Sequence, residues 1–213
     1  MSFGNGIMEH TLAYRLWQRP FQEQKFAPID RHNDPAHVHR VLDVGCGPGT
    51  NTAHFEGVDY LGVDFNEGYV DYARRRYGRD FLVADITEWS MDGLEPFDFV
   101  FVNSFLHHVS DADALRILRR LANFLAPDGH VHVLDLVVPE RRNIAQLLAR
   151  WDRGDYPRPL AVWRELLSEV FEPVLFEPYR LTAAGVTLWN FVYFKGKARG
   201  QEQISDALRS AQR

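Results

Sequence analysis

Residues 41–49 read Val-Leu-Asp-Val-Gly-Cys-Gly-Pro-Gly, an apolar strand sequence that runs into a loop with glycine at every second position. Glycine adopts backbone dihedrals that other residues avoid, and without a Cβ it lets a ligand lie against the main chain. The polar segment that begins at Thr50 predicts a short helix whose N-terminal amides point at that ligand. A strand, a glycine loop and a helix in this order predict a nucleotide-binding α/β domain.

The glycine spacing separates two kinds of nucleotide site. A dinucleotide fingerprint reads G-x-G-x-x-G, whereas this loop reads G-x-G-x-G and has Thr50 at the position of the third dinucleotide glycine. An acid, Asp43, stands inside the strand two residues before the first glycine. This run resembles the first motif of class I S-adenosylmethionine (SAM)-dependent methyltransferases. The resemblance implies that Asp43 helps to orient the methionine end of SAM and that Gly45, Cys46 and Gly47 line the cofactor.

Two further predicted strands, residues 60–64 and 81–86, each carry an acid near the carboxyl end. A carboxylate at the position of Asp64 accepts strong hydrogen bonds from ribose hydroxyls, a device that NAD enzymes share. Asp85 resembles the methyltransferase position that binds the adenine amino group, and Ile86 would offer its backbone amide to the ring. The same resemblance assigns two more cofactor contacts, Phe65 and Asn103.

A fourth predicted strand, residues 97–102, leads into Asn103-Ser104-Phe105-Leu106-His107-His108. This sequence is similar to the fourth motif of methyltransferases that act on small molecules. His107 or His108 would then lie at the reacting edge of the sheet, where a neutral imidazole can accept a proton from an oxygen or nitrogen nucleophile. The alternative is that His107 packs against the cofactor and His108 is a structural hydrogen-bonding residue.

The remaining pattern predicts how the sheet closes. Ser110 and Asp113 have the spacing of a capping box ahead of an apolar helix, which should end at the turn 127–129 before a fifth strand at 130–136. Only four residues separate the predicted strands 173–181 and 186–194, too few for a parallel crossover, so these two strands must be antiparallel.

We therefore expect an α/β, Rossmann-like sheet of seven mostly parallel strands, with the last two strands forming an antiparallel hairpin and with helices on both faces. This topology is the one that the family resemblance implies. The resemblance covers residues 40–195, and we expect it to form the SAM-binding methyltransferase domain. Residues 1–39 are predicted to be an N-terminal helical arm, and residues 196–213 a polar tail.

Two segments outside these motifs are candidates for substrate contacts. A helix over residues 9–19 would carry Tyr14 and Trp17, either as a lid over the cofactor or as aromatic residues that pack the arm onto the domain. The loop 151–159 places Tyr156 and Arg158 next to prolines that stiffen the backbone, so a guanidinium could be presented to a carboxylate or phosphate. The alternative is a solvated surface connection.

Composition limits the other possibilities. A net charge of -5 argues against nucleic-acid partners, and no apolar run approaches the ~20 residues of a membrane span. The single cysteine, Cys46, excludes an internal disulfide and fits a reducing, cytoplasmic location. The spacing of His32, His37 and His39 matches no standard zinc pattern, so no metal is expected. The pattern does not indicate an oligomeric state.

The sequence as a whole predicts a SAM-dependent methyltransferase that modifies an O, N or C nucleophile of a small molecule and releases S-adenosylhomocysteine. Two alternatives use the same cofactor motifs. One is an enzyme that modifies SAM itself, and the other is a SAM-binding partner protein without turnover.

Overall fold

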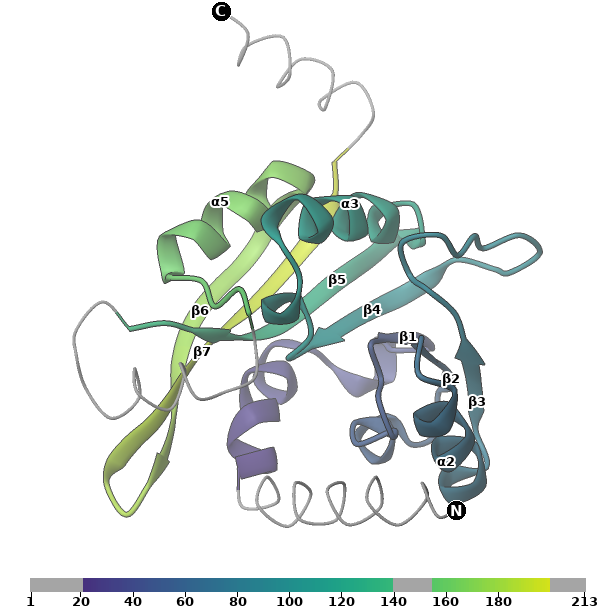
Figure 1. The fold of residues 1–213 in the computed structure, drawn as a ribbon, viewed down its shortest axis with the longest axis horizontal. Coiled ribbons are helices and arrows are strands. Elements are labelled where there is room, and N and C mark those ends of the chain that lie inside the picture. Colours follow the sequence, from purple (N-terminus) through teal and green to yellow (C-terminus); the bar gives the residue numbers. More distant parts are fainter. Residues whose placement is uncertain (1–20, 140–154, 200–213) are drawn as a thin grey trace, which may run out of the picture.

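The computed structural model describes residues 21–139 and 155–199 of the 213-residue chain. Its centre is a seven-stranded sheet with the order β3-β2-β1-β4-β5-β7-β6 (Figure 1). The strands from β1 to β5 run parallel, and β7 lies antiparallel to both β5 and β6. The predicted topology is therefore confirmed. The strand bounds are β1 Arg40–Val44, β2 Asp59–Asp64, β3 Asp80–Val83, β4 Phe97–Asn103, β5 Leu125–Val137, β6 Phe171–Ala183 and β7 Val186–Ala198.

Helices cover both faces of the sheet (Figure 1). On one face α3, Asp111–Ala122, packs with α5, Leu160–Val170, over a core that includes inward residues of β1, β4 and β5. On the other face α2, Glu67–Tyr77, and the helical residues 21–32 enclose a second, aromatic-rich core. Because both faces are buried, the central strands carry apolar residues on both sides, as the four consecutive buried apolar residues 99–102 of β4 show.

Short 3-10 elements lie between the strands and helices. The segment after the glycine loop forms a four-residue 3-10 helix, η2 Thr52–Phe55, whose first amide, that of Thr52, donates to the Gly49 carbonyl at 3.2 Å. Two further 3-10 turns, η1 Pro35–His37 and η3 Leu106–His108, precede β1 and α3. Ser110 is the N-cap of α3, as the capping-box spacing predicts, since its Oγ accepts a bond from the Asp113 amide at 3.2 Å. The Asp113 side chain accepts a bond from the Ser110 hydroxyl at 2.8 Å.

Two predicted boundaries are wrong. The turn 127–129 lies inside β5 as an irregularity, because the pairing with β4 passes from Phe97–Leu125 to Phe99–His130. Gly129 is required there, since a Cβ would lie 2.7 Å from the Phe97 carbonyl oxygen. At the other end β7 continues to Ala198, past the predicted end of the strand at residue 194. The predicted helix 9–19 and most of the polar tail lie outside the described residues.

Candidate functional site

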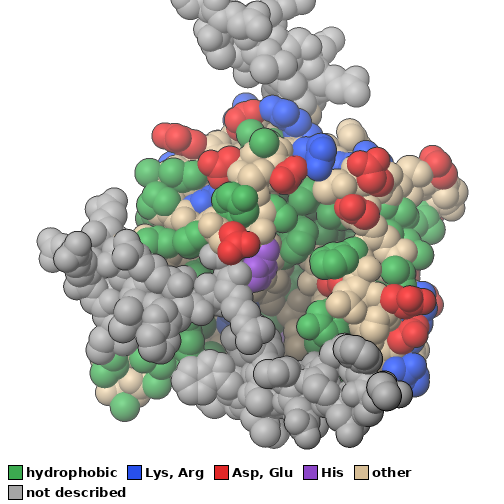
Figure 2. Space-filling view, viewed as in Figure 1, with side chains coloured by type: hydrophobic (Ala, Val, Ile, Leu, Met, Phe, Trp, Pro, Cys, Tyr) green, Lys and Arg blue, Asp and Glu red, His purple; other side chains and the backbone are tan. Residues whose placement is uncertain are grey.

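A cavity of about 380 Å³ opens at the carboxyl ends of the parallel strands. Five of the predicted cofactor residues line it: Gly45, Asp64, Phe65, Asp85 and Ile86. Figure 2 shows a partly covered histidine near the middle of the view, with hydrophobic and acidic side chains around it. The turn after β4 and the first turns of α3 contribute Phe105, Val109, Asp113, Arg116 and Ile117, and the end of β2 and the segment after β3 add Val63, Ala84 and Thr87.

The glycine loop is shaped by its backbone. Gly45, Gly47 and Gly49 have φ of 66°, 53° and 78°, in the left-handed region that favours glycine. The amides of Gly45 and Cys46 donate to the Val63 carbonyl at 2.8 and 3.1 Å, which fixes the start of the loop to β2. A Cβ on Gly45 would lie 2.9 Å from the Phe105 ring, so glycine is also required by space.

Asp64, the last residue of β2, holds the middle of this loop. Its Oδ2 accepts a bond from the Gly47 amide at 2.9 Å, and its Oδ1 accepts one from the Asn66 amide at 2.8 Å. A carboxylate has about four acceptor positions, so these two bonds leave capacity for ribose hydroxyls. Next to it, Phe65 is 74% exposed, a large apolar side chain at the cavity wall. Binding of the cofactor by these two residues stays a prediction.

Asp85 follows β3 and lies on the cavity wall with Ile86. Its Oδ1 accepts bonds from the Thr87 amide at 2.8 Å and the Thr87 hydroxyl at 2.7 Å. These bonds, with a smaller contribution from the Arg116 charge, hold the pKa of Asp85 below its usual range. Asp85 is therefore an ionised acceptor at neutral pH, as recognition of an amino group requires.

Asp43 lies within β1, fully buried. Its carboxyl accepts a bond from the Tyr60 hydroxyl at 2.7 Å and from Asn51 Nδ2 at 3.2 Å. Burial raises the pKa of Asp43 from 3.8 to about 7, although the bonds from Tyr60 and Asn51 lower it. Asp43 thus binds Asn51, which follows the glycine loop, and Tyr60 of β2. Its role in orienting the methionine end of SAM stays a prediction.

A chain of side-chain bonds continues from Asn51 to the N-terminal helical residues. Asn103 Nδ2 donates to Asn51 Oδ1 at 2.8 Å, and the Ser104 hydroxyl donates to Asn103 Oδ1 at 3.2 Å. The buried Lys25 donates to Ser104 Oγ at 2.7 Å. Asn103, predicted as a cofactor contact, therefore connects the end of β4 to the turn after β1. Cys46 is buried and burial raises the pKa of its thiol, which disfavours a reactive thiolate.

The structure adds a residue that the sequence interpretation missed. Asp135 in β5 is fully buried, and its Oδ1 lies 2.5 Å from Nδ1 of His107, which is itself only 2% exposed. Asp135 Oδ2 also accepts a bond from the Leu106 amide at 2.9 Å. The ring of His108 lies 4.1 Å from that of His107, centroid to centroid. The sequence did contain a signal for Asp135: like Asp43, it is an acid inside an apolar strand, where a carboxyl group is costly unless it has hydrogen-bond partners.

The predicted role of Arg158 is wrong. Its side chain is not presented to a substrate but is buried at 2% exposure. Its Nη1 donates to the Leu106 carbonyl at 2.6 Å, its Nη2 to the Val109 carbonyl at 2.7 Å, and its Nε to Asp111 at 2.7 Å. Tyr156 is 46% exposed and remains a predicted substrate contact. The predicted lid residues Tyr14 and Trp17 lie outside the described residues.

The histidines before β1 pair with nearby acids. His32 Nε2 lies 2.7 Å from Glu177, and His37 Nδ1 lies 3.2 Å from Asp34. Among residues 21–139 and 155–199, no group of three or more His, Cys, Asp or Glu side chains is placed to hold a metal ion. Within the same ranges, no helix has the length and apolar character needed to cross a bilayer.

Comparison with known proteins agrees with this geometry. Residues 41–129, which include the glycine loop and both strand-end acids, match the Methyltransf_25 family, described as a methyltransferase domain. Residues 41–129 therefore resemble a methyltransferase domain, consistent with a class I methyltransferase. The methyltransferase fold is also that of the DhpI complex with S-adenosylhomocysteine, at a TM-score of 0.68 and 18% identity over 91% of this chain and 92% of that chain. NodS, an N-methyltransferase from Bradyrhizobium japonicum, gives a TM-score of 0.67 at 17% identity, over 85% of this chain and 89% of the NodS chain.

Relatives with closer sequences carry a substrate in their names. A trans-aconitate 2-methyltransferase from Rhodopseudomonas palustris is 30% identical over 72% of this chain and 61% of its own length. One from Methylobacterium nodulans is 39% identical over 42% of this chain and 35% of its own. The chain therefore spans less than two thirds of the length of these relatives.

Proposed function

We propose that this methyltransferase binds SAM in the cavity at the carboxyl edge of its sheet and transfers the methyl group to a small molecule. The observation that carries the proposal is that Gly45, Asp64 and Asp85, from three separate strand ends, line one cavity. Methyl transfer is an in-line displacement at carbon with an activated sulfonium leaving group. The protein's work is therefore to align nucleophile, methyl carbon and sulfur and to exclude water.

His107 is the proposed general base. With its Nδ1 bonded to the Asp135 carboxylate, the proton sits on Nδ1 and Nε2 is the basic nitrogen. Such a base removes the proton from a hydroxyl or amine as the methyl group is transferred. A carboxylate acceptor needs no base, because it is already ionised at neutral pH. The His107–Asp135 pair thus favours an acceptor that has a proton to lose.

A second candidate acceptor is a small carboxylate. The names of the trans-aconitate 2-methyltransferase relatives support it. The net charge of -5 supports a partner other than nucleic acid, and the single cysteine supports a reducing compartment such as the cytoplasm.

Two experiments test the proposal. Mass spectrometry of the ligand carried by the purified protein should find SAM or S-adenosylhomocysteine, whereas a modified cofactor would favour an enzyme that acts on SAM itself. Methyl-labelled SAM is then incubated with trans-aconitate and with a panel of small alcohols, phenols and amines. Binding without label transfer to any compound, cell extract included, would favour a non-catalytic SAM-binding protein. Calorimetry that detects NADH but no heat from SAM would contradict the whole assignment.

The variant His107→Gln separates the two acceptor classes. Loss of a general base should slow transfer to a hydroxyl or amine by about 10²–10⁴-fold. Transfer to trans-aconitate should stay within about threefold, since a carboxylate needs no deprotonation at pH 7. An equal loss with both classes would mean that His107 positions the acceptor rather than removing its proton.

A further inference from the structure

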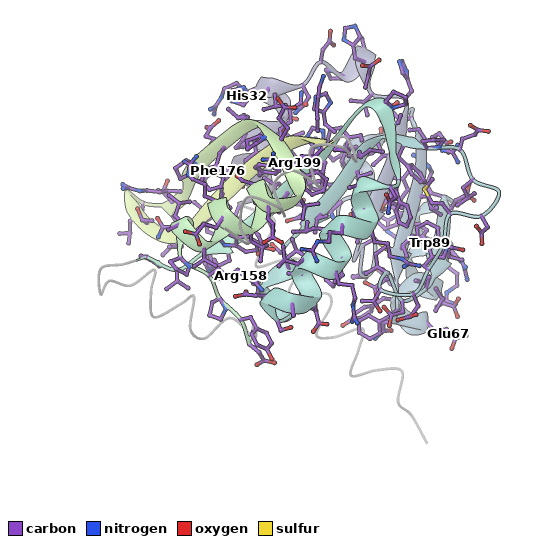
Figure 3. The ribbon with its side chains drawn as sticks, turned by 90° about the horizontal axis from the view of Figure 1, so that it is seen from above. His32, Glu67, Trp89, Arg158, Phe176 and Arg199 are labelled. Carbon is purple, nitrogen blue, oxygen red and sulfur yellow. The ribbon has the colours of Figure 1, made fainter. Side chains whose placement is uncertain are left out.

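Arg158 joins two parts of the chain that are far apart in sequence. It stands just before α5 (labelled in Figure 3), and its guanidinium donates to the Leu106 carbonyl in the turn between β4 and α3. Two of its nitrogens bind the carbonyls of Leu106 and Val109, which bracket η3. The third binds Asp111, the first residue of α3.

The turn that carries His107 is held from two sides. From β5, Asp135 binds the Leu106 amide and the His107 ring. From the segment before α5, Arg158 binds the two bracketing carbonyls, and the Tyr156 amide donates to the His107 carbonyl at 3.0 Å. That segment is itself fixed to the end of β5, because the Val138 amide donates to the Arg158 carbonyl at 2.9 Å.

A guanidinium suits this position for a physical reason. A buried cation is costly unless its donors are bonded, and here one charge partner and two carbonyls receive them. Its carbon also lies 5.1 Å from the centre of the Trp163 ring. The planar fork binds groups on both sides of the turn at once, which a lysine ammonium at a single point cannot do.

We propose that Arg158 is a positioning residue for His107: by fixing both ends of η3 it keeps the imidazole in register with Asp135. The catalytic consequence of this role rests on the proposed function. The structural consequence does not rest on the proposed function, because it concerns only the tautomer of the His107 ring.

Nuclear magnetic resonance of ¹⁵N-labelled histidine tests the ring directly. The His107 signals are identified among those of the nine histidines by their loss in His107→Gln. In Arg158→Lys, the Nδ1 and Nε2 shifts of His107 should move toward the average of the two tautomers. Arg199→Ala is the matched control, because Arg199 also donates to two backbone carbonyls, those of Phe171 and Ser168, and lies apart from Arg158 (Figure 3). It should leave the His107 signals unchanged.

Kinetics give the second measurement. With an acceptor found in the labelled-SAM screen, Arg158→Lys should lower kcat at least tenfold and leave the KM for SAM within twofold. The pH profile of kcat should also change in Arg158→Lys and not in Arg199→Ala, which a general loss of stability would not produce.

Two outcomes would overturn the positioning role. One is a folded Arg158→Lys protein whose His107 signals match those of the unsubstituted protein. If Arg158→Lys does not fold, Asp111→Asn decides, because the Asp111 side chain is 66% exposed and the substitution removes only the charge partner. Unchanged His107 signals in Asp111→Asn would then reject the role, and smaller shifts in the same direction would support it. Shifted His107 signals in a protein that transfers no methyl group would reject the proposed function alone.

Discussion

Replacing Asp43 with asparagine tests the energetic consequence of a carboxyl buried beneath the glycine loop. Burial raises the pKa of Asp43 from 3.8 to about 7. Because the pKa in the folded state exceeds the unfolded value, the folded chain binds more protons between these limits. The free energy of unfolding therefore falls as the pH rises through this window. One pKa unit equals about 1.36 kcal/mol, so the full cost of ionising Asp43 is about 4 kcal/mol, of which about 2 kcal/mol falls between pH 5 and pH 7.

The Asp43→Asn variant carries no charge at this position and should lack this pH dependence. Its free energy of unfolding, relative to that of the unsubstituted protein, should rise by about 2 kcal/mol from pH 5 to pH 7. Urea unfolding followed by circular dichroism at pH 5, 6, 7 and 8 measures this difference. Burial lowers the pKa of His130 and of His132, which makes stability rise with pH over part of the same range, but their contribution cancels between the two proteins.

Tyr60→Phe supplies the control. The Tyr60 hydroxyl bond lowers the pKa of Asp43, so its removal should raise that pKa further and extend the loss of stability to higher pH. Parallel stability curves for Asp43→Asn and the unsubstituted protein from pH 5 to pH 8 would refute the reasoning, since they would mean that Asp43 ionises equally in both states.

Substitutions of three cavity residues, Asp64, Asp85 and Gly45, are tested by calorimetry with SAM. Asp64→Ala should weaken binding by about 2–3 kcal/mol, roughly a hundredfold, and Asp64→Glu by less; unchanged affinity in the alanine variant would mean that the ribose is held elsewhere. Asp85→Ala should be milder, because the backbone amide of Ile86 remains, and a larger loss than at Asp64 would contradict this. Gly45→Ala should lower the free energy of unfolding by about 1–3 kcal/mol and weaken SAM binding, since its Cβ would lie 2.9 Å from the Phe105 ring. Gly185→Ala is the control: Gly185 has φ of 77° but open space around it, so this variant should show the cost of backbone strain without a steric clash.

The arrangement of the cofactor residues could be predicted from sequence for a geometric reason. Parallel strands place their carboxyl ends at one edge of a sheet, so acids that end successive strands must meet there. Asp64 and Asp85 needed only the strand assignment to be placed beside Gly45, and the structure puts all three on one cavity wall.

Asp135 and Arg158 were beyond this reasoning because their roles depend on long-range contacts. Asp135 meets His107 across 28 residues, and only the adjacency of β4 and β5 brings them together. Arg158 meets Leu106 across 52 residues. The flanking prolines indicated a stiff backbone, but local stiffness does not tell which side of the segment faces the protein, and this side chain points inward.

Position along the strand separates the four aspartates of the site into two kinds. Asp64 and Asp85, at or beyond the ends of their strands, lie on the cavity wall. Asp43 and Asp135, inside apolar strands, are fully buried and bind the segments that follow β1 and β4. A buried carboxylate is tolerated only where its acceptors are used, so each interior acid specifies one conformation of the segment it binds. Substitution of a strand-end acid should therefore act first on SAM affinity. Substitution of an interior acid should act first on the pH dependence of stability or on the state of His107.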